Sequence, residues 1–369
     1  MLSEIQTLAS GGPGQQFSYR RLRFGPGAPR ATIQASLHAD EVPAMLVAHK
    51  LRERLERLEA AGDLLGGVQL VPYANPLGLA QHLQGQHHGR FDLRDGINFN
   101  RAYPDLAPRV VDVLQGRLGD DEAANAALIR SALADSAAAL FSSTPTQDLK
   151  HRLLAQAVAS EIVLDLHCDS QAPMHLYGLT PQHAMAAELG ALLGAEAILL
   201  ATESGDMPFD EACSTPWLAL RQRFPEHPIP LGCFAVTVEL RGEADTRHDW
   251  AESDADAIVE FLRRRGLVAG TPAPLPPARC EPTPLAASEP ITSPVAGVVV
   301  FRAEPGEQVA AGAPIADVIC PDSGQVTTLR CQGAGRLYAR IATRWATPGK
   351  RLAKIAGTTV VRSGKLLSA

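Results

Sequence analysis

The stretch Glu161-Ile162-Val163-Leu164-Asp165-Leu166-His167 decides how the rest of the chain is interpreted. Its apolar run is typical of a buried strand, and it ends in polar residues with the spacing Asp-x-His. Successive side chains of a strand point to opposite faces, so Asp165 and His167 share a face. In open α/β sheets ligands bind beyond the carboxyl ends of strands, which is where this pattern puts His167. Asp165 is then a candidate partner that orients the His167 ring.

A second polar segment, His38-Ala39-Asp40-Glu41, lies far upstream and has the spacing His-x-x-Glu. It follows the alternating segment 31–37 and precedes a helical pattern, so His38 lies where a strand gives way to a helix. Glu41, three residues on, can face the same ligand. Two histidines and one glutamate are an established ligand set of catalytic zinc sites. We therefore predict one Zn²⁺ per chain, bound by His38, Glu41 and His167. Alone, the His-x-x-Glu pair would more often be a histidine at a helix start beside a solvated carboxylate.

A glutamate also interrupts the apolar strand predicted at 233–240, within Thr237-Val238-Glu239-Leu240-Arg241-Gly242. A carboxylate in such a strand requires a partner. A partly desolvated glutamate suits the base that takes a proton from a metal-activated water and passes it to the leaving group. This pattern predicts Glu239 as the catalytic base, and a strand-end pair with Arg241 is the alternative.

Two arginines and two asparagines occur in the loop 91–104, between the two metal-binding segments. Guanidinium groups bind carboxylates with two hydrogen bonds, and an asparagine amide can orient a polar substrate. The loop therefore favours a substrate that carries a carboxylate. A loop held together by Arg–Asp pairs, such as Arg94 with Asp92 or Asp95, is the structural alternative.

The ordered set His-x-x-Glu, Asn-Arg, Asp-x-His and a late glutamate resembles the succinylglutamate desuccinylase and aspartoacylase family, which is related to the zinc carboxypeptidases. The resemblance extends from about residue 30 to about residue 265. It implies zinc ligands at His38, Glu41 and His167, Glu239 as general base and acid, Asn100 and Arg101 as the substrate-carboxylate pair, and Arg94 as the group that polarises the scissile carbonyl. One departure is Ala39, where the family often has glycine; its methyl group would lie beside the metal and narrow the pocket.

Strand-type and helical patterns alternate along the first 270 residues, which favours an α/β fold with a mixed, mostly parallel sheet. Strands are predicted at about 31–37, 68–74, 161–167, 197–202 and 233–240, and helices at about 41–61, 121–159, 181–194 and 249–267. Together with the resemblance, this pattern predicts a zinc-carboxypeptidase-like sheet flanked by helices over residues 1–270.

The C-terminal part of the chain has a different composition. Eight of the twenty-four residues in 271–294 are proline, which predicts an extended connector. Residues 295–369 show short strand patterns in two related halves, typical of a small all-β sandwich that resembles the biotinyl and lipoyl carrier fold. The turn 321–325 between the halves has no lysine to carry a cofactor. We expect a non-carrier module that packs on the enzyme and walls its entrance, or one that only stabilises it or forms a dimer contact.

Composition narrows the class of protein. A length of 369 residues with 46% hydrophobic content provides a sizeable core, and a net charge of −6 argues against nucleic acid or an anionic membrane as the partner. The N-terminus lacks the apolar segment of a secretory signal, so we expect a cytoplasmic protein, either monomeric or a homo-oligomer. Six cysteines without Cys-x-x-Cys spacing predict reduced thiols, and Cys168, beside His167, is predicted to be a buried thiol rather than a ligand or nucleophile.

These features predict a zinc-dependent amidohydrolase that removes the acyl group from an N-acyl amino acid or a related small amide bearing a carboxylate. A zinc carboxypeptidase acting on small peptides would use the same metal and arginines. A non-catalytic binding or carrier protein is the alternative from another class, although the missing carrier lysine and the intact base argue against it.

Overall fold

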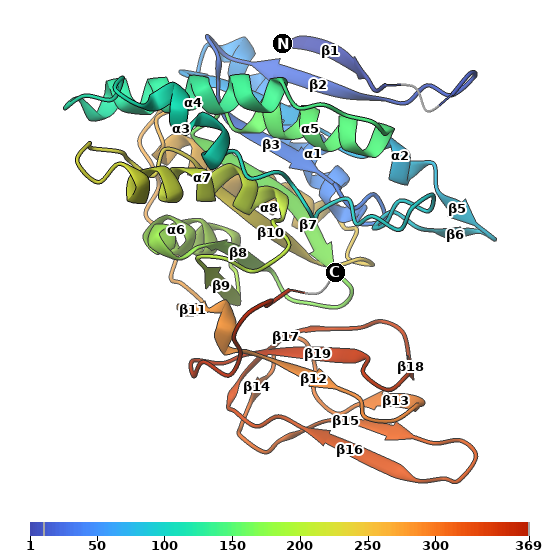
Figure 1. The fold of residues 1–369 in the computed structure, drawn as a ribbon. Helices are drawn as coiled ribbons and strands as arrows, with labels where there is room; N and C mark the ends of the chain where they lie inside the picture. The colour runs from blue at the N-terminus through green and yellow to red at the C-terminus, as the bar shows by residue number, and fades with distance from the viewer. Residues whose placement is uncertain (10–11, 368–369) are drawn as a thin grey trace.

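The computed structural model describes residues 1–9 and 12–367, which form a large α/β domain and a smaller β-domain below it (Figure 1). Within these residues the large domain is built on a nine-stranded mixed sheet in the order β1-β2-β4-β3-β7-β10-β8-β9-β11. Its strands are β1 (Leu2–Thr7), β2 (Ser18–Phe24), β3 (Pro29–Ala35), β4 (Gly67–Val71), β7 (Ile162–Asp169), β8 (His175–Leu179), β9 (Ala197–Ala201), β10 (Phe234–Gly242) and β11 (Pro282–Pro284). The predicted α/β fold with a mixed sheet is confirmed.

Helices cover both faces of the sheet because each has one apolar side. One face is covered by α1 (Pro43–Ala61), α6 (His183–Leu193) and α8 (His248–Arg264), and the other by α3 (Ala107–Leu114), α4 (Glu122–Ala138), α5 (Pro145–Ala157) and α7 (Phe209–Arg223). In α8 the buried positions Ala251, Ala255, Ile258 and Leu262 recur every three or four residues, as one face of a helix requires. Short elements are α2 (Pro76–Leu79), η1 (Thr180–Gln182), η2 (Leu285–Ala287), and the hairpin of β5 (His82–Leu83) and β6 (Gln86–His87).

The prediction of one helix over 121–159 was wrong, because two helices occupy that range. The helix α4 ends at Ala138, and α5 begins at Pro145 with the Thr144 side chain accepting a hydrogen bond from the Gln147 amide at 3.1 Å. Proline has no amide hydrogen for a continuing helix but fits its first position. The helices α3 and α7 and strand β8 were not predicted.

The β-domain consists of two four-stranded antiparallel sheets that enclose their own apolar core. Its strands are β12 (Ser288–Thr292), β13 (Gly297–Phe301), β14 (Gln308–Val309), β15 (Pro314–Ile319), β16 (Val326–Arg330), β17 (Gly335–Arg340), β18 (Trp345–Ala346) and β19 (Arg351–Ala356). The sheet orders are β12-β19-β17-β14 and β16-β15-β13-β18. The short strand β14 of the first half thus joins the sheet of β17 and β19, and the short strand β18 of the second half joins the sheet of β13 and β15. This exchange agrees with the predicted two-fold sandwich.

The segment 271–294 is more ordered than an extended connector. It contains β11, which pairs in parallel with β9 of the large sheet, and β12, which is already the first strand of the β-domain. Hydrogen bonding explains this difference, because the backbone polar groups of Ser288–Thr292 pair with those of β19 in an antiparallel sheet. The chain after β19 returns to the large domain, where the Leu366 amide donates to the Ser204 carbonyl at 2.8 Å.

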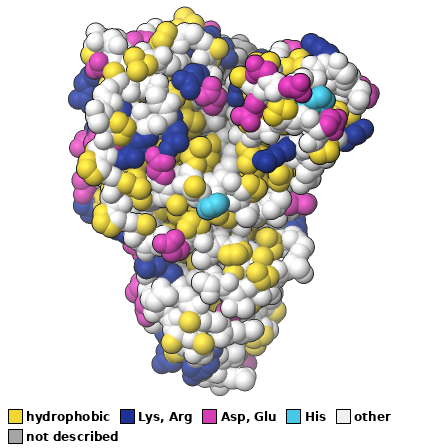
Figure 2. Space-filling model, turned by 90° about the vertical axis from the view of Figure 1, so that its left-hand side faces the viewer, with side chains coloured by type: hydrophobic (Ala, Val, Ile, Leu, Met, Phe, Trp, Pro, Cys, Tyr) yellow, Lys and Arg dark blue, Asp and Glu magenta, His cyan; other side chains and the backbone are white. Residues whose placement is uncertain are grey.

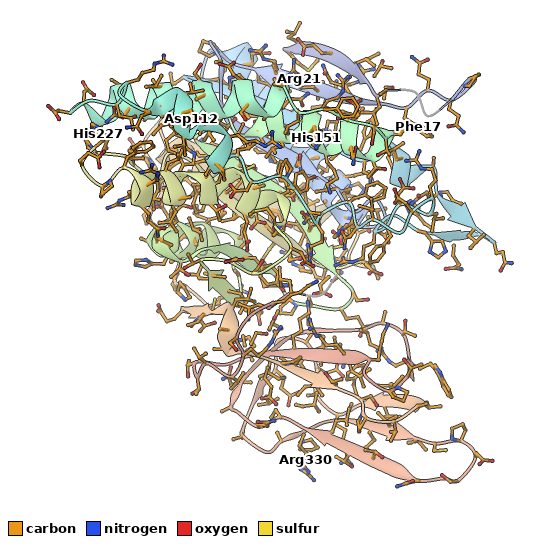
Figure 3. All side chains as sticks on the ribbon, in the orientation of Figure 1. Phe17, Arg21, Asp112, His151, His227 and Arg330 are labelled. Carbon is orange, nitrogen blue, oxygen red and sulfur yellow. The ribbon has the colours of Figure 1, made fainter. Side chains whose placement is uncertain are left out.

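The two domains are joined by ion pairs and by an apolar contact. Lys354 on β19 pairs with Asp169 on β7 at 2.6 Å, and Arg336 on β17 pairs with Glu196 at 2.7 Å. Tyr338 packs in the same apolar cluster as Leu285 and residues of β8 and β9. In Figure 3, Arg330 on β16 labels the end of the sandwich that lies farthest from the large sheet. The contact therefore involves one sheet of the β-domain, that of β17 and β19.

Acidic and basic side chains are interspersed on the face shown in Figure 2, where the β-domain is the narrower lower part. Among the described residues, no helix has the length and apolar character needed to cross a membrane.

Gly89 lies against the loop that carries His38. The Ala39 amide donates to the Gly89 carbonyl at 3.0 Å, and a Cβ atom at Gly89 would lie 2.0 Å from the Asp40 nitrogen. This close approach requires glycine, because backbone atoms cannot move away as a flexible side chain could.

We predict that Gly89→Ala displaces the His38 loop and lowers the free energy of unfolding by about 1–3 kcal/mol, the usual cost of overpacking. Denaturant unfolding measures this change. Gly119→Ala is the matched control, since a Cβ atom there meets nothing within 4 Å and should alter stability little. Equal effects of the two substitutions would contradict the proposed close contact.

Candidate metal centre and active site

The carboxylate of Glu41 lies between two imidazole rings at the carboxyl ends of β3 and β7. Nδ1 of His38 is 2.8 Å from Oε1 of Glu41, and Nδ1 of His167 is 2.6 Å from Oε2. One ligand atom from each of the three residues lies within 4.8 Å of the others, and all three side chains are buried. The structure thus brings together the three residues predicted as metal ligands, although His167 lies 126 positions after Glu41 in the chain.

The remaining ring nitrogens are held by hydrogen bonds that leave both Nδ1 atoms facing the centre. Nε2 of His38 is 2.9 Å from Oδ1 of Asn98, and Nε2 of His167 is 2.9 Å from Oδ2 of Asp165. An acceptor at Nε2 favours the tautomer that carries its proton there, which leaves the Nδ1 lone pair for a metal. This donor set fits a divalent cation such as zinc. The predicted partnership of Asp165 with His167 is present in this geometry.

Asp165 is itself held in place, since Gln34 on the adjacent strand β3 donates to its Oδ1 at 2.9 Å. Asn98 was missed as a partner of His38. Its position in the Asn-Phe-Asn-Arg run beside Asn100 was the available signal, but nothing in the sequence distinguishes one asparagine from the other.

Burial and neighbouring charges shift the pKa values of all three proposed ligands. Burial and the neighbouring Arg90 lower the pKa of His38, which favours the neutral, metal-binding ring. Burial also opposes a charge on His167, but Asp165 and Glu41 outweigh it and raise its pKa. For Glu41 the burial penalty is outweighed by His167 and His38, which lower its pKa. The proton that His167 retains therefore balances the charge of the Glu41 carboxylate, whereas His38 stays neutral.

Glu239 lies beside the metal-binding residues because of strand register. In the parallel pair of β10 and β7, Glu239 stands opposite His167. Burial, followed by the charges of Glu41 and Asp169, raises the pKa of Glu239 to about 8, and its Oε2 has no hydrogen-bond partner among the described residues. Arg241 instead binds Asp254 through two hydrogen bonds of 2.8 and 2.9 Å. The alternative of a Glu239–Arg241 pair is thus excluded, and Glu239 has the surroundings expected of a base.

The metal centre is contacted by Arg90, not by Arg94. Nη1 of Arg90 lies 3.1 Å from Nδ1 of His38 and 3.5 Å from Oε1 of Glu41. Arg94 donates to both oxygens of Asp92 and to Thr146, and it does not line the cavity around the metal centre. The predicted catalytic role of Arg94 does not match this geometry, because the Arg94–Asp92 pair ties down the loop.

Asn100 and Arg101 both line the cavity, as predicted for substrate-binding residues. Oδ1 of Asn100 accepts a hydrogen bond from the Phe209 amide at 2.8 Å, which joins the loop to the start of α7. Nδ2 of Asn100 lies 3.5 Å from Nε2 of His167. Burial lowers the pKa of Arg101, although the charges of Asp210 and Asp206 favour its cationic form. Arg101 is thus a buried guanidinium in the cavity wall.

Two residues next to the ligands have no role in metal binding in this geometry. The methyl group of Ala39 faces Gly78, where an added Cβ would lie 2.8 Å away, and Ala39 is not among the described residues that line the cavity. The expected narrowing of the pocket by this methyl group is therefore not observed. Cys168 is buried, and burial raises the pKa of its thiol. Its amide, not its sulfur, contacts Glu41, at 3.1 Å.

The metal centre opens into a cavity of about 580 Å³ that lies between the two domains. The large domain contributes the ligands, Glu239, Arg90, Asn100 and Arg101, and the β-domain contributes residues of β17, β19 and the C-terminal segment, including Tyr338, Arg340, Lys354 and Leu366. The β-domain therefore forms one wall of the cavity, so access to the metal centre depends on it.

Comparison with known proteins places this site in a family. The family described as succinylglutamate desuccinylase/aspartoacylase catalytic domain matches residues 27–265. A comparison with curated proteins gives no significant match. Among solved structures, a protein from Shewanella amazonensis assigned to this family has 27% identity and a TM-score of 0.85, covering 96% of this chain and 98% of its own. A protein from Shewanella frigidimarina has 25% identity and a TM-score of 0.84, covering 96% of each chain.

The match includes every residue of the proposed metal centre, and the similarity in fold extends over the β-domain as well. On this evidence the chain belongs to the succinylglutamate desuccinylase/aspartoacylase family of hydrolases.

Proposed function

We propose that this protein is a zinc-dependent amidohydrolase that removes the acyl group from an N-acyl amino acid or a related small amide bearing a carboxylate. The observation that carries the proposal is the position of Glu239. A buried glutamate with an unpartnered oxygen stands opposite His167, and both line one cavity with His38 and Glu41. A glutamate that only forms a structural ion pair needs no unpartnered oxygen in a cavity. Hydrolysis by an activated water, in contrast, needs a carboxylate that is available as a base beside the metal.

His38, Glu41 and His167 would hold the metal ion, which when bound lowers the pKa of a water molecule and polarises the amide carbonyl. Glu239 accepts a proton from the attacking water and donates it to the leaving nitrogen. Its raised pKa, about 8, suits both steps, because the same group must gain and lose a proton. The local positive charge of a bound cation would bring that pKa down toward neutrality.

Arg90 and Arg101 would bind the negatively charged groups of the reacting substrate. The Arg90 guanidinium, next to His38, is placed to donate hydrogen bonds to the oxyanion that forms on the carbonyl oxygen. Arg101, deeper and more buried, would bind the substrate carboxylate. The β-domain wall limits the cavity to about 580 Å³, which favours small amides over long peptides.

Metal removal should abolish activity. We expect about one zinc per chain by elemental analysis, loss of N-acyl amino acid hydrolysis after chelation, and recovery on adding zinc. His167→Ala should remove the metal, whereas Cys168→Ala should retain it, because only the Cys168 backbone contacts Glu41. A protein without stoichiometric metal, or a preference for dipeptides over N-acyl amino acids in product analysis, would contradict the proposal.

Glu239→Gln should lower kcat by about 10²–10⁴-fold while the metal content stays unchanged, because glutamine keeps the shape but cannot accept the proton. Steady-state kinetics together with metal analysis on the same preparation measures both quantities. Near-normal turnover of this variant would place the base elsewhere.

The two arginines provide a matched pair. Arg90→Ala should lower kcat by about 10²–10³-fold through loss of a donor to the oxyanion. Arg94→Ala should leave kcat within about twofold and act mainly on stability, because Arg94 is bound to Asp92 and Thr146 rather than facing the cavity. A larger loss of kcat with Arg94→Ala than with Arg90→Ala would restore the role first predicted for Arg94.

A further inference from the structure

A lysine of the β-domain reaches the active-site cavity. Lys354 lies on β19 and lines the cavity together with Glu239, and its Nζ donates to Oδ2 of Asp169 on β7 at 2.6 Å. Burial opposes a charge on Lys354, but Asp169 outweighs burial and raises the pKa of the lysine. The side chain is therefore an ammonium group that the second domain contributes to the cavity.

The Lys354 ammonium has donors that the protein does not use in this geometry. A lysine ammonium carries three N–H donors. Among the described residues, Nζ donates only to Asp169, and the ring of Tyr338 lies 5.7 Å from it. Two donors thus remain for other acceptors in the cavity.

Strand register places two acceptors without donors next to each other. Glu239 on β10 stands opposite His175 on β8 in the antiparallel pair. The side chains of such a pair lie on the same face of the sheet, with Cβ atoms about 4.5–5.5 Å apart. Oε2 of Glu239 and Nε2 of His175 are buried and have no hydrogen-bond partner among the described residues. Buried polar atoms are nearly always paired, so both atoms are expected to receive a hydrogen bond.

His175 can only accept a hydrogen bond at Nε2. Its Nδ1 lies 3.0 Å from the carbonyl oxygen of Pro173, so the ring proton is on Nδ1. Burial lowers the pKa of His175 to about 4, and the charge of Lys354 acts in the same direction. The ring is therefore neutral, and Nε2 carries a lone pair that faces no donor.

The charge of Lys354 acts on both of these side chains. Burial raises the pKa of Glu239, and the Lys354 ammonium opposes that shift, as it also affects His175. A role in domain attachment alone would not require this position. The pair of Arg336 with Glu196, at 2.7 Å, joins the same two domains, and Arg336 is not among the described residues that line the cavity.

We propose that Lys354 is a positioning residue for the base, because its ammonium can donate to Oε2 of Glu239 and to Nε2 of His175 while Asp169 accepts its third hydrogen bond. This inference rests on the proposed function and adds a residue of the β-domain to the same site. The flexible lysine stem allows these contacts. A bond to Oε2 orients the Glu239 carboxylate so that Oε1 takes the proton of the attacking water and passes it to the leaving nitrogen. Lys354 keeps its own proton throughout.

Lys354→Met tests this role, because methionine keeps a flexible apolar stem but has no ammonium. In the zinc-loaded full-length protein, kcat for N-acetyl amino acids should fall about 10–100-fold, the range for a hydrogen bond to a charged group, while KM and metal content stay within about twofold. Arg336→Met is the matched control, since it removes the other ion pair between the domains and no cavity residue. This control should keep kcat within about twofold of the unmodified protein.

Two further measurements separate positioning from domain attachment. In Lys354→Ala, added propylammonium replaces the missing part of the side chain and should raise kcat about tenfold, whereas 1-propanol of the same size should not. In denaturant unfolding of the zinc-loaded protein, the effects of Lys354→Met and Glu239→Gln should not add in the double variant, because the two side chains interact. Arg336→Met and Glu239→Gln should add.

The outcomes separate the two proposals. Normal kcat in Lys354→Met, an equal loss of kcat in Arg336→Met, or a loss confined to KM would overturn the inference and leave the amidohydrolase proposal standing. Additive unfolding of Lys354→Met with Glu239→Gln, or no response of Lys354→Ala to propylammonium, would also overturn the inference alone. Failure of the zinc-loaded protein to hydrolyse any N-acyl amino acid would overturn both.

Discussion

The Glu41 carboxylate, shared between Nδ1 of His38 and Nδ1 of His167, is the contact on which the rest of the site depends. A buried carboxylate without partners would cost several kcal/mol, so the protein must either bind a cation or keep a proton on His167. The other ring nitrogen of each histidine, Nε2, is hydrogen-bonded to Asn98 in His38 and to Asp165 in His167. The geometry of the centre is thus set before any metal binds, and every other group is placed relative to it.

Strand pairing also fixes the positions of Glu239 and Asp165 relative to the metal centre. The parallel register of β7 and β10 puts Glu239 opposite His167, and the pairing of β3 with β7 puts Gln34 next to Asp165. The β-domain then closes the opposite side through Lys354, which pairs with Asp169 two residues after the last ligand. Hydrogen bonds of the sheet, rather than loop conformations alone, therefore position the base, one ligand and the contact with the second domain.

The sequence was sufficient where chemistry is tied to a regular element. The positions of the three proposed ligands, Glu239 and Asp165 follow from strand ends and strand alternation, which are local patterns. It was insufficient in the loop before Asn100, where Arg90 and Arg94 are equally plausible by spacing. Only the Arg94–Asp92–Thr146 contacts, which join residues 52 positions apart, decide which guanidinium faces the metal centre. The helix α7 was missed for the same reason, since its first turn approaches Ser204 only in the folded chain.

Two imidazoles and one carboxylate are proposed to bind a single zinc ion. X-ray absorption spectroscopy at the zinc edge of the zinc-loaded protein tests it most directly, because nitrogen and oxygen ligands near 2.0–2.1 Å differ from sulfur ligands near 2.3 Å. We expect a shell of nitrogen and oxygen ligands with the scattering of two imidazole rings and no sulfur. A sulfur ligand, as from Cys168, or a shell without imidazole would contradict it.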